Sequence, residues 1–377
     1  MHNQGGLSAY SSAMNAQLSF NPGVPYNDLP PLPPNTTVET RAVLKAVIAA
    51  NKELGALDSA CRLIPNPEII TSTIPLREAQ ASSEIENIAT TNDELFRAAF
   101  AVDDEPTSAT KAALRYNTAL HIGVQSLQTR PLSVRTAEEV CTVLQNSPAK
   151  IRSTAGTFIG DPVRNVKYYT PPEGKEIVEQ HLSRWERFIY SDHDLDSLVL
   201  LALLHYQFEA IHPFYDGNGR TGRILNILLL IQERLLRLPV LCLSGYIVKN
   251  KSDYYRLLRA VTTENSWEEW IIFIVKGVEE SARAASTMIE KLWTLQESTS
   301  TKLREEANIG PTNDLAALLF THPYITIKNI EDAGLAKRQA AAHWLHSLVD
   351  LGVLKEIKRG RQKVFINHRA LDVLMQP

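Results

Sequence analysis

Apolar residues between Thr37 and Arg283 recur mostly at spacings of three and four positions, which is the period of an amphipathic helix. The ranges that share this pattern are 39–54, 83–100, 109–127, 137–144, 173–190 and 267–288. Two other ranges, 195–211 and 220–236, are apolar on most faces, which favours a position at the centre of a bundle. The sequence therefore predicts a mainly α-helical fold.

A short stretch inside this region has the pattern of a sheet instead. Residues 157–159 and 166–170 flank the turn-forming sequence Gly160-Asp-Pro-Val-Arg-Asn165, and two prolines end the second segment. Two strand-forming segments joined by a turn predict a β-hairpin. We expect this hairpin to be set in the helical domain.

The pattern changes again after the polar range 297–312, which contains Ser-Thr-Ser-Thr and Gly310-Pro311 and indicates a domain boundary. Three short helices are expected beyond it, followed by two alternating segments that form a β-ribbon. Their ranges are 314–320, 326–332, 337–351, 353–357 and 363–366. Three helices and a β-ribbon are typical of a winged-helix module, and Trp344, Leu345, Leu348 and Val349 are its expected core.

These patterns divide the chain into four parts. They are an N-terminal tail or strap (1–36), a helical region (37–110), a helical core with the hairpin (111–295) and a winged-helix module (311–377). The tail contains Leu29-Pro-Pro-Leu-Pro-Pro34, which predicts an extended segment. We favour a strap lying over the next domain over a ligand for proline-reading domains.

Composition limits the classes of function. The chain has 377 residues, 44% hydrophobic and 21% charged, which is ordinary for a globular protein of two or three domains and excludes a mainly disordered chain. The net charge is −3, from 42 acidic and 39 basic side chains. Any contact with nucleic acid must therefore come from a local patch.

The cysteines and the chain start point to a reducing compartment. Cys61, Cys141 and Cys242 lie far apart, so neither a zinc knuckle nor a disulfide framework is indicated. The N-terminal sequence lacks a basic start followed by an apolar run, as a secretory signal would have. The most apolar run, 224–231, is far short of the ~20 residues of a membrane span. We expect a cytoplasmic protein with no membrane partner.

The strongest chemical signal is the stretch His212-Pro-Phe-Tyr-Asp-Gly-Asn-Gly-Arg-Thr-Gly-Arg223. Pro213 disfavours helix at the preceding residue, so the imidazole should lie at a helix end beside a loop. The two glycines and the Asn of Asp216-Gly-Asn-Gly219 tolerate left-handed backbone angles and predict a tight turn. A Gly-rich turn that leads into a helix N-terminus binds anions through free N–H groups and the helix dipole.

The side chains around this turn suit phosphate chemistry. Arg220 and Arg223 lie three positions apart at the start of the helix, and guanidinium groups suit phosphate oxygens. The carboxylate of Asp216 suits Mg²⁺ shared with substrate phosphates better than a metal cage of its own. His212 can take a proton from a hydroxyl. The stretch therefore predicts attack on a nucleoside triphosphate, with a plain helix–helix corner as the alternative.

Every fixed position of the stretch matches the motif His-x-Phe-x-Asp/Glu-Gly-Asn-Gly-Arg-x-x-Arg, so the chain resembles the Fic family. The resemblance extends over roughly residues 29–283. It implies a Fic-type helical bundle with a β-hairpin flap, and transfer of AMP from ATP to a Tyr, Thr or Ser hydroxyl of a target protein. It also implies that His212 is the general base and that Asp216 binds Mg²⁺. The phosphate-binding residues that it implies are Gly217, Asn218, Gly219, Arg220, Thr221, Gly222 and Arg223, the last at the γ-phosphate.

Related activities stay open. Doc-type relatives phosphorylate their targets and have Lys where this chain has Gly219, which argues against a kinase. Relatives that transfer other nucleotides or phosphocholine share too much of the motif to be separated from it.

The resemblance also gives the hairpin a function as the flap. A target segment would add as a strand to its free edge and present a hydroxyl towards His212. The flap residues near the nucleotide would be Val166, Lys167, Tyr168 and Tyr169, and Tyr254 and Tyr255 would be further nucleotide contacts. An ordinary surface hairpin, and buried packing of Tyr254 and Tyr255, are the alternatives.

Ser82-Ser-Glu-Ile-Glu-Asn87 has two interpretations. Ser83 and Glu86 have the spacing of a capping box, which would start a helix here. The stretch also resembles the inhibitory motif Ser/Thr-x-x-x-Glu-Gly/Asn of the family, through Ser82, Glu86 and Asn87. That resemblance implies that Glu86 pairs with Arg223 and keeps it from the γ-phosphate. In some relatives the same Glu positions a water that removes AMP, so AMP removal also stays open.

The partners are less defined than the chemistry. Basic side chains of the C-terminal module outnumber acidic ones by three, and Lys337 and Arg338 begin its third helix, where DNA-reading side chains would lie. A protein contact is the alternative. Two hypotheses follow: a self-inhibited protein adenylyltransferase, whose target can include itself, and a DNA-binding regulator with a Fic sensor core. The sequence leaves a homodimer open.

Overall fold

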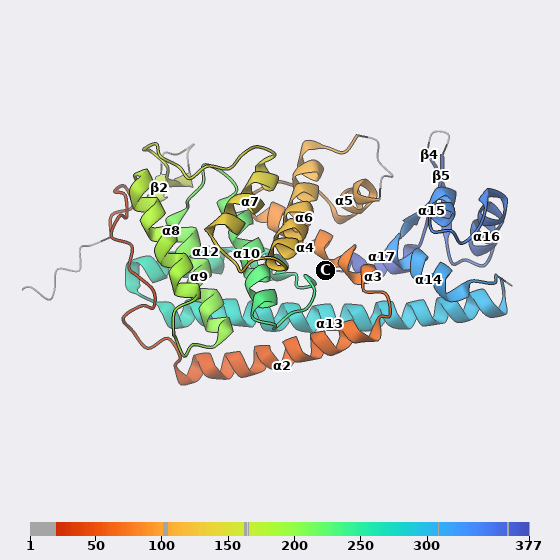
Figure 1. Cartoon of the computed structure of the whole chain (residues 1–377), viewed down its shortest axis with the longest axis horizontal. Coiled ribbons are helices and arrows are strands. Elements are labelled where there is room, and N and C mark those ends of the chain that lie inside the picture. Colours follow the sequence, from red (N-terminus) through yellow and green to blue (C-terminus); the bar gives the residue numbers. More distant parts are fainter. Residues whose placement is uncertain are drawn as a thin grey trace, which may run out of the picture.

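The computed structural model of the chain describes residues 20–100, 105–161, 164, 166–307, 309–359 and 362–376. The fold is mainly helical, as predicted (Figure 1). The hairpin lies towards one end of the elongated molecule, and the C-terminal module lies at the other.

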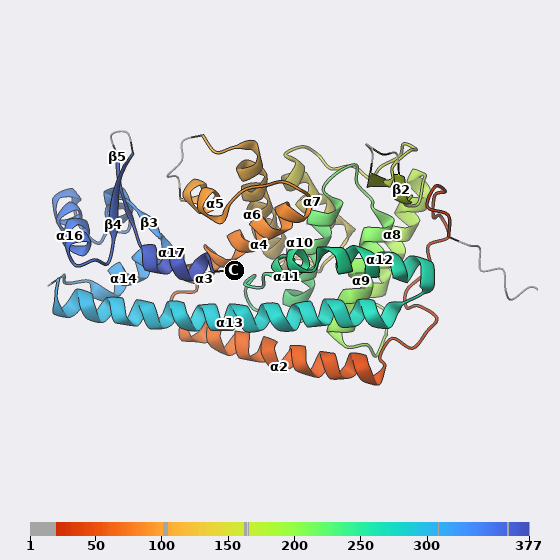
Figure 2. The same cartoon turned by 180° about the vertical axis from the view of Figure 1, so that it is seen from behind.

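Two long helices run side by side, as both views show, and the longer one extends over most of the length of the molecule (Figure 1, Figure 2). They are α2 (Arg41–Leu63) and α13 (Trp267–Glu305). The polar range 297–312, predicted as a domain boundary, is helical in its first part, because α13 continues to Glu305. Thr299 and Ser300 are buried there, and the Thr299 hydroxyl donates to the carbonyl of Leu295 at 2.8 Å. Tertiary packing thus keeps a Ser/Thr-rich sequence helical.

The predicted central helices form the middle of the bundle. They are α9 (Ser197–Ile211), whose residues from Leu198 onward are all buried, and α10 (Asn218–Gln232). The helices around them are α6 (Ser108–Leu127), α7 (Val134–Gln145), α8 (Lys175–Ile189), α11 (Leu243–Lys249) and α12 (Lys251–Glu264). The sequence pattern missed α11 and α12.

The N-terminal helices differ from the prediction. A single helix at 83–100 was expected, but the structure has α3 (Glu68–Thr71), α4 (Ile74–Ile85) and α5 (Asn92–Ala99). Ser83 and Glu86 do not cap a helix start: Ser83 lies in the last turn of α4 and its hydroxyl donates to Ala79. The capping box lies farther on, at Thr91 and Glu94, where α5 begins. Asn87 follows the end of α4 and has a left-handed φ of 60°.

The hairpin is present with shifted bounds. Strands β1 (Ile159–Asp161) and β2 (Val166–Tyr169) pair antiparallel, with Ile159 opposite Tyr169. The proline-rich segment lies next to the exit of this hairpin: the backbone N–H of Tyr26 donates to Thr170, and the side chain of Gln207 donates to the carbonyl of Pro30 at 3.0 Å. This extended segment therefore contacts both the hairpin and α9.

The C-terminal part contains the predicted three helices and ribbon. They are α14 (Thr312–Thr321), α15 (Ile327–Asp332), α16 (Arg338–Asp350), β4 (Lys355–Arg359) and β5 (Gln362–Ile366). A short strand β3 (Tyr324–Ile325) and a last helix α17 (His368–Leu374) were not predicted, and the sheet order is β3-β5-β4. Leu345 and Leu348 are buried, whereas Trp344 and Val349 are only half-buried. The predicted ribbon tip at 360–361 lies outside the described residues.

Among the helices that the structure describes, none is both long enough and apolar enough to cross a lipid bilayer.

Candidate functional site

The motif forms a tight loop between α9 and α10. Asn218 closes it: the Asn218 Oδ1 accepts from the backbone N–H of Phe214 and its Nδ2 donates to the carbonyl of the same residue, both at 2.7 Å. Gly217 has a φ of 78°, a conformation that glycine adopts without strain. The loop leads directly into the N-terminus of α10, whose first backbone N–H groups have no partner within the helix. The predicted anion-binding turn therefore has the expected geometry.

His212 lies at the C-terminal end of α9 with a left-handed φ of 50°. Its pKa is lowered to about 4, first because the ring is enclosed and then because the guanidinium of Arg152 is close. The imidazole is therefore neutral at physiological pH. A neutral ring can accept a proton, which is what a general base requires.

Arg223 is buried on α10 and is bound by α4. Its Nε donates to Ser82 Oγ at 2.8 Å, and its Nη2 donates to Ser82 O at 3.0 Å and to Glu86 Oε1 at 2.8 Å. Only 3% of the Arg223 side chain is exposed, against 37% for Glu86. Burial disfavours the charge of Arg223, but the carboxylates of Glu86 and Glu209 outweigh it and raise the pKa of this arginine.

The Glu86 carboxylate also lies against the start of α10. A Cβ atom on Gly219 would overlap Glu86 Oε1, so the close approach requires a glycine at this position. Burial opposes the negative charge of Glu86, yet Arg223 holds the pKa of this carboxyl below its usual value. An ionised carboxylate thus occupies the N-terminal end of the helix, where an anion is favoured.

Asn87 forms the turn at the end of the stretch 82–87. Its φ of 60° follows the last turn of α4, and its backbone N–H donates to Glu84 at 3.0 Å. Gly and Asn are the residues that adopt this conformation most readily, which explains why the motif accepts either. Lys251 donates to the Asn87 side chain at 3.3 Å.

Asp216 lies at the mouth of the loop. Its side chain is 77% exposed, and its Oδ2 is 3.4 Å from Arg220 Nη2. In the described part of the chain, no group of three or more His, Cys, Asp or Glu side chains is placed to hold a metal ion. A single accessible carboxylate beside an anion-binding turn fits Mg²⁺ that is carried mainly by phosphate oxygens and water.

Two further residues of the turn are buried in the helix. Thr221 is fully buried on α10. Gly222 permits α9 to approach, since a Cβ there would overlap Glu209 Oε1. Thr221 and Gly222 therefore shape the packing beneath the turn.

A cavity of about 560 Å³ lies between the hairpin, α9 and α12. Its lining includes Tyr168, Tyr169, Tyr255 and Glu209. The structure thus brings together two of the predicted flap residues and one of the two predicted tyrosines of α12. Val166 and Lys167 are exposed on the hairpin and do not line the cavity.

Tyr254, by contrast, faces the protein interior. It is 1% exposed, and its hydroxyl lies 2.9 Å from His205 Nε2. Its ring packs against Trp270. The alternative interpretation as a packing residue fits Tyr254, whereas Tyr255 is accessible.

Sequence reasoning missed three buried charged residues near the site. Glu209 lines the cavity, and among the described residues its Oε1 has no hydrogen-bond partner. Arg152 contacts the His212 backbone. Glu78 accepts from Tyr116 at 2.9 Å and from the Ser244 backbone at 2.9 Å, and anchors α4 to α6 and α11. The sequence spacing could have pointed to Glu78, because Glu78, Ser82 and Glu86 recur every fourth position, which places such residues on one face of a helix.

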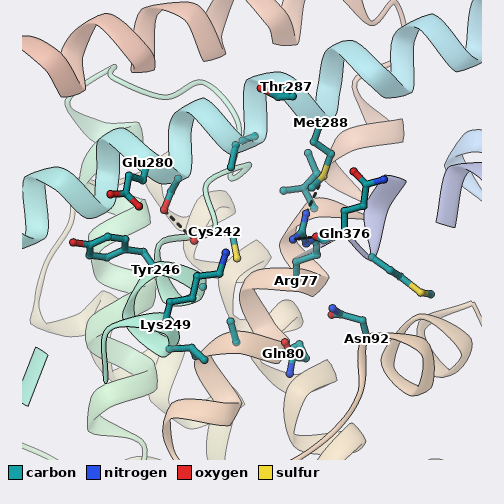
Figure 3. Close-up of a pocket in the computed structure, with 18 of the residues that line it drawn as sticks. Arg77, Gln80, Asn92, Cys242, Tyr246, Lys249, Glu280, Thr287, Met288 and Gln376 are labelled. Atoms are coloured by element: carbon teal, nitrogen blue, oxygen red, sulfur yellow. Dashed lines mark hydrogen bonds between the residues drawn. The ribbon is translucent and has the colours of Figure 1, made fainter. Parts of the chain in front are cut away.

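A second and larger cavity, of about 790 Å³, is lined in part by α4 and includes no residue of the motif loop (Figure 3). It is bounded by α4, α11, α13 and the end of α17. Arg77 of α4 donates to the carbonyl of Gln376 at 2.6 Å and contacts Met288 Sδ at 3.2 Å. Helix α4, which ends next to Glu86, therefore contacts α10 through Ser82 and the C-terminal module through Arg77.

Three family domains match the chain in succession. Residues 44–125 match the Fic/DOC family N-terminal domain, and residues 135–230 match the Fic/DOC family domain. Residues 295–370 match the C-terminal domain of SoFic-like protein adenylyltransferases. The second match contains the whole motif loop, and the first contains the stretch 82–87.

Curated relatives match over part of their length. A protein adenylyltransferase Fic of Drosophila melanogaster is 33% identical over 112 residues, which are 29% of this chain and 21% of the relative. A probable protein adenylyltransferase of Aquifex aeolicus is 23% identical over 206 residues, or 52% of this chain and 56% of the relative. The chain therefore spans about a fifth to a half of the length of these relatives.

The solved structure of a Fic family protein from Desulfovibrio desulfuricans G20 has a similar fold. The superposition has a TM-score of 0.57 at 18% identity and covers 89% of this chain and 98% of that chain. At this identity the likeness shows the fold alone. With three Fic-related domains in the order of the chain and the motif complete in the second, the protein belongs to the Fic/DOC family.

Proposed function

We propose that the protein is a self-inhibited adenylyltransferase that transfers AMP from ATP to a Tyr, Thr or Ser hydroxyl of a target protein. One observation carries the proposal: a neutral His212, an anion-binding helix N-terminus and Arg223 converge on a single loop, with a carboxylate seated on the anion site. The names of the relatives support the reaction class.

Each residue of the loop has a chemical role in this reaction. The target hydroxyl attacks the α-phosphorus of ATP, its proton passes to His212, and pyrophosphate leaves. The N–H groups at the start of α10 and the guanidinium of Arg220 hold the phosphate oxygens, and Arg223 would hold the γ-phosphate once it is released from Glu86. Asp216 would hold Mg²⁺, which when bound neutralises phosphate charge.

The cavity between the hairpin and α12 is the proposed site of the nucleoside. Its aromatic lining from Tyr168, Tyr169 and Tyr255 suits a planar base. The edge of β2 that does not pair with β1 is available to a target strand, because residues 166–168 are exposed. This arrangement would bring a target hydroxyl, including one of the chain itself, towards His212.

Self-inhibition is supported by charge and space together. The Glu86 carboxylate takes up the Arg223 guanidinium and lies over Gly219, so a phosphate cannot have the same place. Two negative groups at one anion site also repel each other. ATP would still bind, but with its γ-phosphate outside the pose for transfer.

The test is intact mass after incubation with ATP and Mg²⁺. We expect an AMP-sized gain in Glu86→Gly that is greater than in the unchanged protein and absent in Glu86→Gly with His212→Ala. A phosphate-sized gain would instead indicate a kinase, and release of AMP from a modified protein would indicate AMP removal. Running the same assay with other nucleoside triphosphates separates adenylyl transfer from transfer of another nucleotide. If correctly folded Glu86→Gly transfers no more than the unchanged protein, self-inhibition by Glu86 is refuted.

A second candidate function is DNA contact through the C-terminal module. Lys337 and Arg338 are exposed at the start of α16, and Lys355 and Lys358 are exposed on β4. One observation argues against DNA contact: Glu356 Oε1 lies 2.8 Å from Lys363 Nζ, and this ion pair neutralises the charge of the lysine. Binding of duplex DNA that weakens steeply with salt would support this function, and Lys337→Glu with Arg338→Glu should abolish it. A change in oligomeric state with protein concentration would test a homodimer.

A further inference from the structure

A buried cation lies directly behind the proposed base. Arg152 is 1% exposed, and the three hydrogen bonds that its guanidinium forms with described residues all go to main-chain carbonyls. Its Nε donates to His212 O at 2.7 Å, and its Nη2 donates to Ile211 O at 3.0 Å and to Pro172 O. Within the part of the chain that the structure describes, its guanidinium forms no salt bridge. A buried charge without a bound carboxylate is costly, so this position calls for an explanation.

The backbone around Arg152 is joined to the motif loop as well. Ile151 forms an antiparallel bridge with Phe214, and the N–H of Arg152 donates to the carbonyl of Pro213 at 2.9 Å. Residues 151–152 therefore form a short extended segment beside the loop. This segment fixes the chain on the C-terminal side of His212, while α9 fixes it on the other side.

The guanidinium of Arg152 supplies hydrogen-bond donors to the carbonyls at the end of α9. The last carbonyls of a helix have no partner within the helix, and Arg152 donates to two of them. His212 itself has a left-handed φ, which a non-glycine residue keeps only where its surroundings hold it. Removing Arg152 would free the carbonyls of Ile211 and His212 and allow the imidazole to turn away.

The same guanidinium joins the base to the hairpin. Pro172 lies three residues beyond β2, and its carbonyl shares Arg152 Nη2 with that of Ile211. The hydroxyl of Tyr169, the last residue of β2, donates at 2.9 Å to the carbonyl of Ala210, the residue before Ile211. The hairpin, which is the proposed flap, and the proposed base are therefore held by one hydrogen-bonded unit.

Three charged groups face the imidazole of His212. Arg152 lies on the extended segment, Glu86 lies at the end of α4, and Asp216 lies in the loop. The guanidinium favours a neutral ring, and both carboxylates favour a charged one. Release of Glu86 would leave Arg152 as the main charge that keeps the ring neutral.

We propose that Arg152 is a positioning residue for the transfer reaction, which holds His212 in register with the hairpin and keeps its ring ready to accept a proton. The proposal rests on the proposed function. Arg152 acts through His212 and the hairpin and does not touch the substrate.

The test uses the full chain with Glu86→Gly as the parent. Arg152→Gln removes the charge and the fork of donors, whereas Arg152→Lys keeps the charge but lacks the planar fork of donors. Lys302→Gln is the matched control, because Lys302 also donates to the carbonyl at a helix end, that of Leu351 at 2.7 Å, but lies outside the catalytic core. Melting temperature and the far-ultraviolet spectrum establish that each variant folds.

We expect Arg152→Gln and Arg152→Lys to lower kcat by about 100-fold, the effect of misplacing a reacting group by about 1 Å, with little change in the KM for ATP. Lys302→Gln should leave kcat unchanged. A kcat within a few-fold of the parent in both Arg152 variants would overturn the proposal. So would an equal loss in Lys302→Gln, since it would show that general destabilisation explains the effect.

A titration followed by nuclear magnetic resonance tests the charge without any transfer. The imidazole signal of His212, identified by its loss in His212→Ala, should titrate at higher pH in Arg152→Gln than in the parent and near the parent value in Arg152→Lys. Equal pKa values in all three proteins would contradict the role of the charge. If Glu86→Gly transfers no AMP, the proposed function fails while this titration still decides the placement of Arg152.

Discussion

Two buried arginines flank the motif loop, and they differ in what binds them. Arg223, on the α10 side, is held by the side chain of Glu86 and by Ser82 of α4. Arg152, on the α9 side, is held by the carbonyls of Ile211, His212 and Pro172. A carboxylate on a separate helix can move away, whereas the carbonyls of a helix end cannot. We infer that the contact of Arg223 with Glu86 can be released, whereas the contacts of Arg152 with the carbonyls are permanent.

The partners of the two arginines also differ in exposure to solvent, which supports the same inference. Glu86 keeps 37% of its side chain exposed although its partner is buried, so water can replace it with little rearrangement. Arg152 has no such exposed partner. Under the proposed function the site must both hold its base still and admit a phosphate, and these two requirements fall on the two ends of one loop.

The largest effect on stability is expected from replacing Arg223, the buried partner of the Arg223–Glu86 pair. Arg223→Gln leaves Glu86 next to a neutral amide, and losing one partner of a buried pair costs about 3–5 kcal/mol, less here because Glu86 is partly exposed. Adding Glu86→Gln should restore part of the free energy of unfolding, measured by urea denaturation. Equal stability of the single and double variants would show that the two side chains are not coupled.

A smaller effect is expected at Gly219. Gly219→Ala places a methyl group on Glu86 Oε1, so it should lower the melting temperature of the unchanged protein. In Glu86→Gly the carboxylate is absent and the same substitution should cost clearly less, with only the end of Arg223 left to adjust. Thermal unfolding of the four proteins measures this difference. If Gly219→Ala costs the same in both backgrounds, the carboxylate does not lie over the helix start.

The smallest effect is a dependence of stability on pH that sharpens the role of α4. Burial raises the pKa of Glu78 to about 7 from an ordinary value of 4.5, despite hydrogen bonds from Ser244 and Tyr116. Because the folded pKa is the higher one, the stabilising contribution of the protonated form is complete below pH 4.5 and is lost as the pH rises through about 7. Relative to Glu78→Gln, the unchanged protein should therefore lose stability over this interval. Parallel stability curves for the two proteins, from thermal unfolding at pH 4 to 8, would refute this titration.

The sequence anticipated the parts of the site that lie within one local pattern. The turn at Gly217, the helix end at His212 and the helix start at Asn218 follow from Pro, Gly and Asn at fixed spacing. The helical class and the hairpin follow from periodicity. The pairing of Glu86 with Arg223 was expected only through resemblance to a family, because 137 residues separate the two side chains.

The errors concern positions where local signals compete. Ser83 and Glu86 have the spacing of a helix start, but they lie at a helix end, because the apolar face of Ile74–Ile85 packs on the core and Asn87 turns the chain. The Ser/Thr-rich end of α13 is helical because it packs against the C-terminal module. In both cases burial outweighed the local preference.

The sequence by itself determined the motif, its loop and the kind of chemistry that the loop can perform, because backbone angles and side-chain types are local properties. Tertiary structure alone decided which charges meet. It placed Glu86 on Arg223, Arg152 behind His212 and Tyr255 in the cavity while Tyr254 faces the core. The physical reason is that the pKa of a side chain and its hydrogen bonds depend on neighbours that are distant in sequence and become close only when the helices pack.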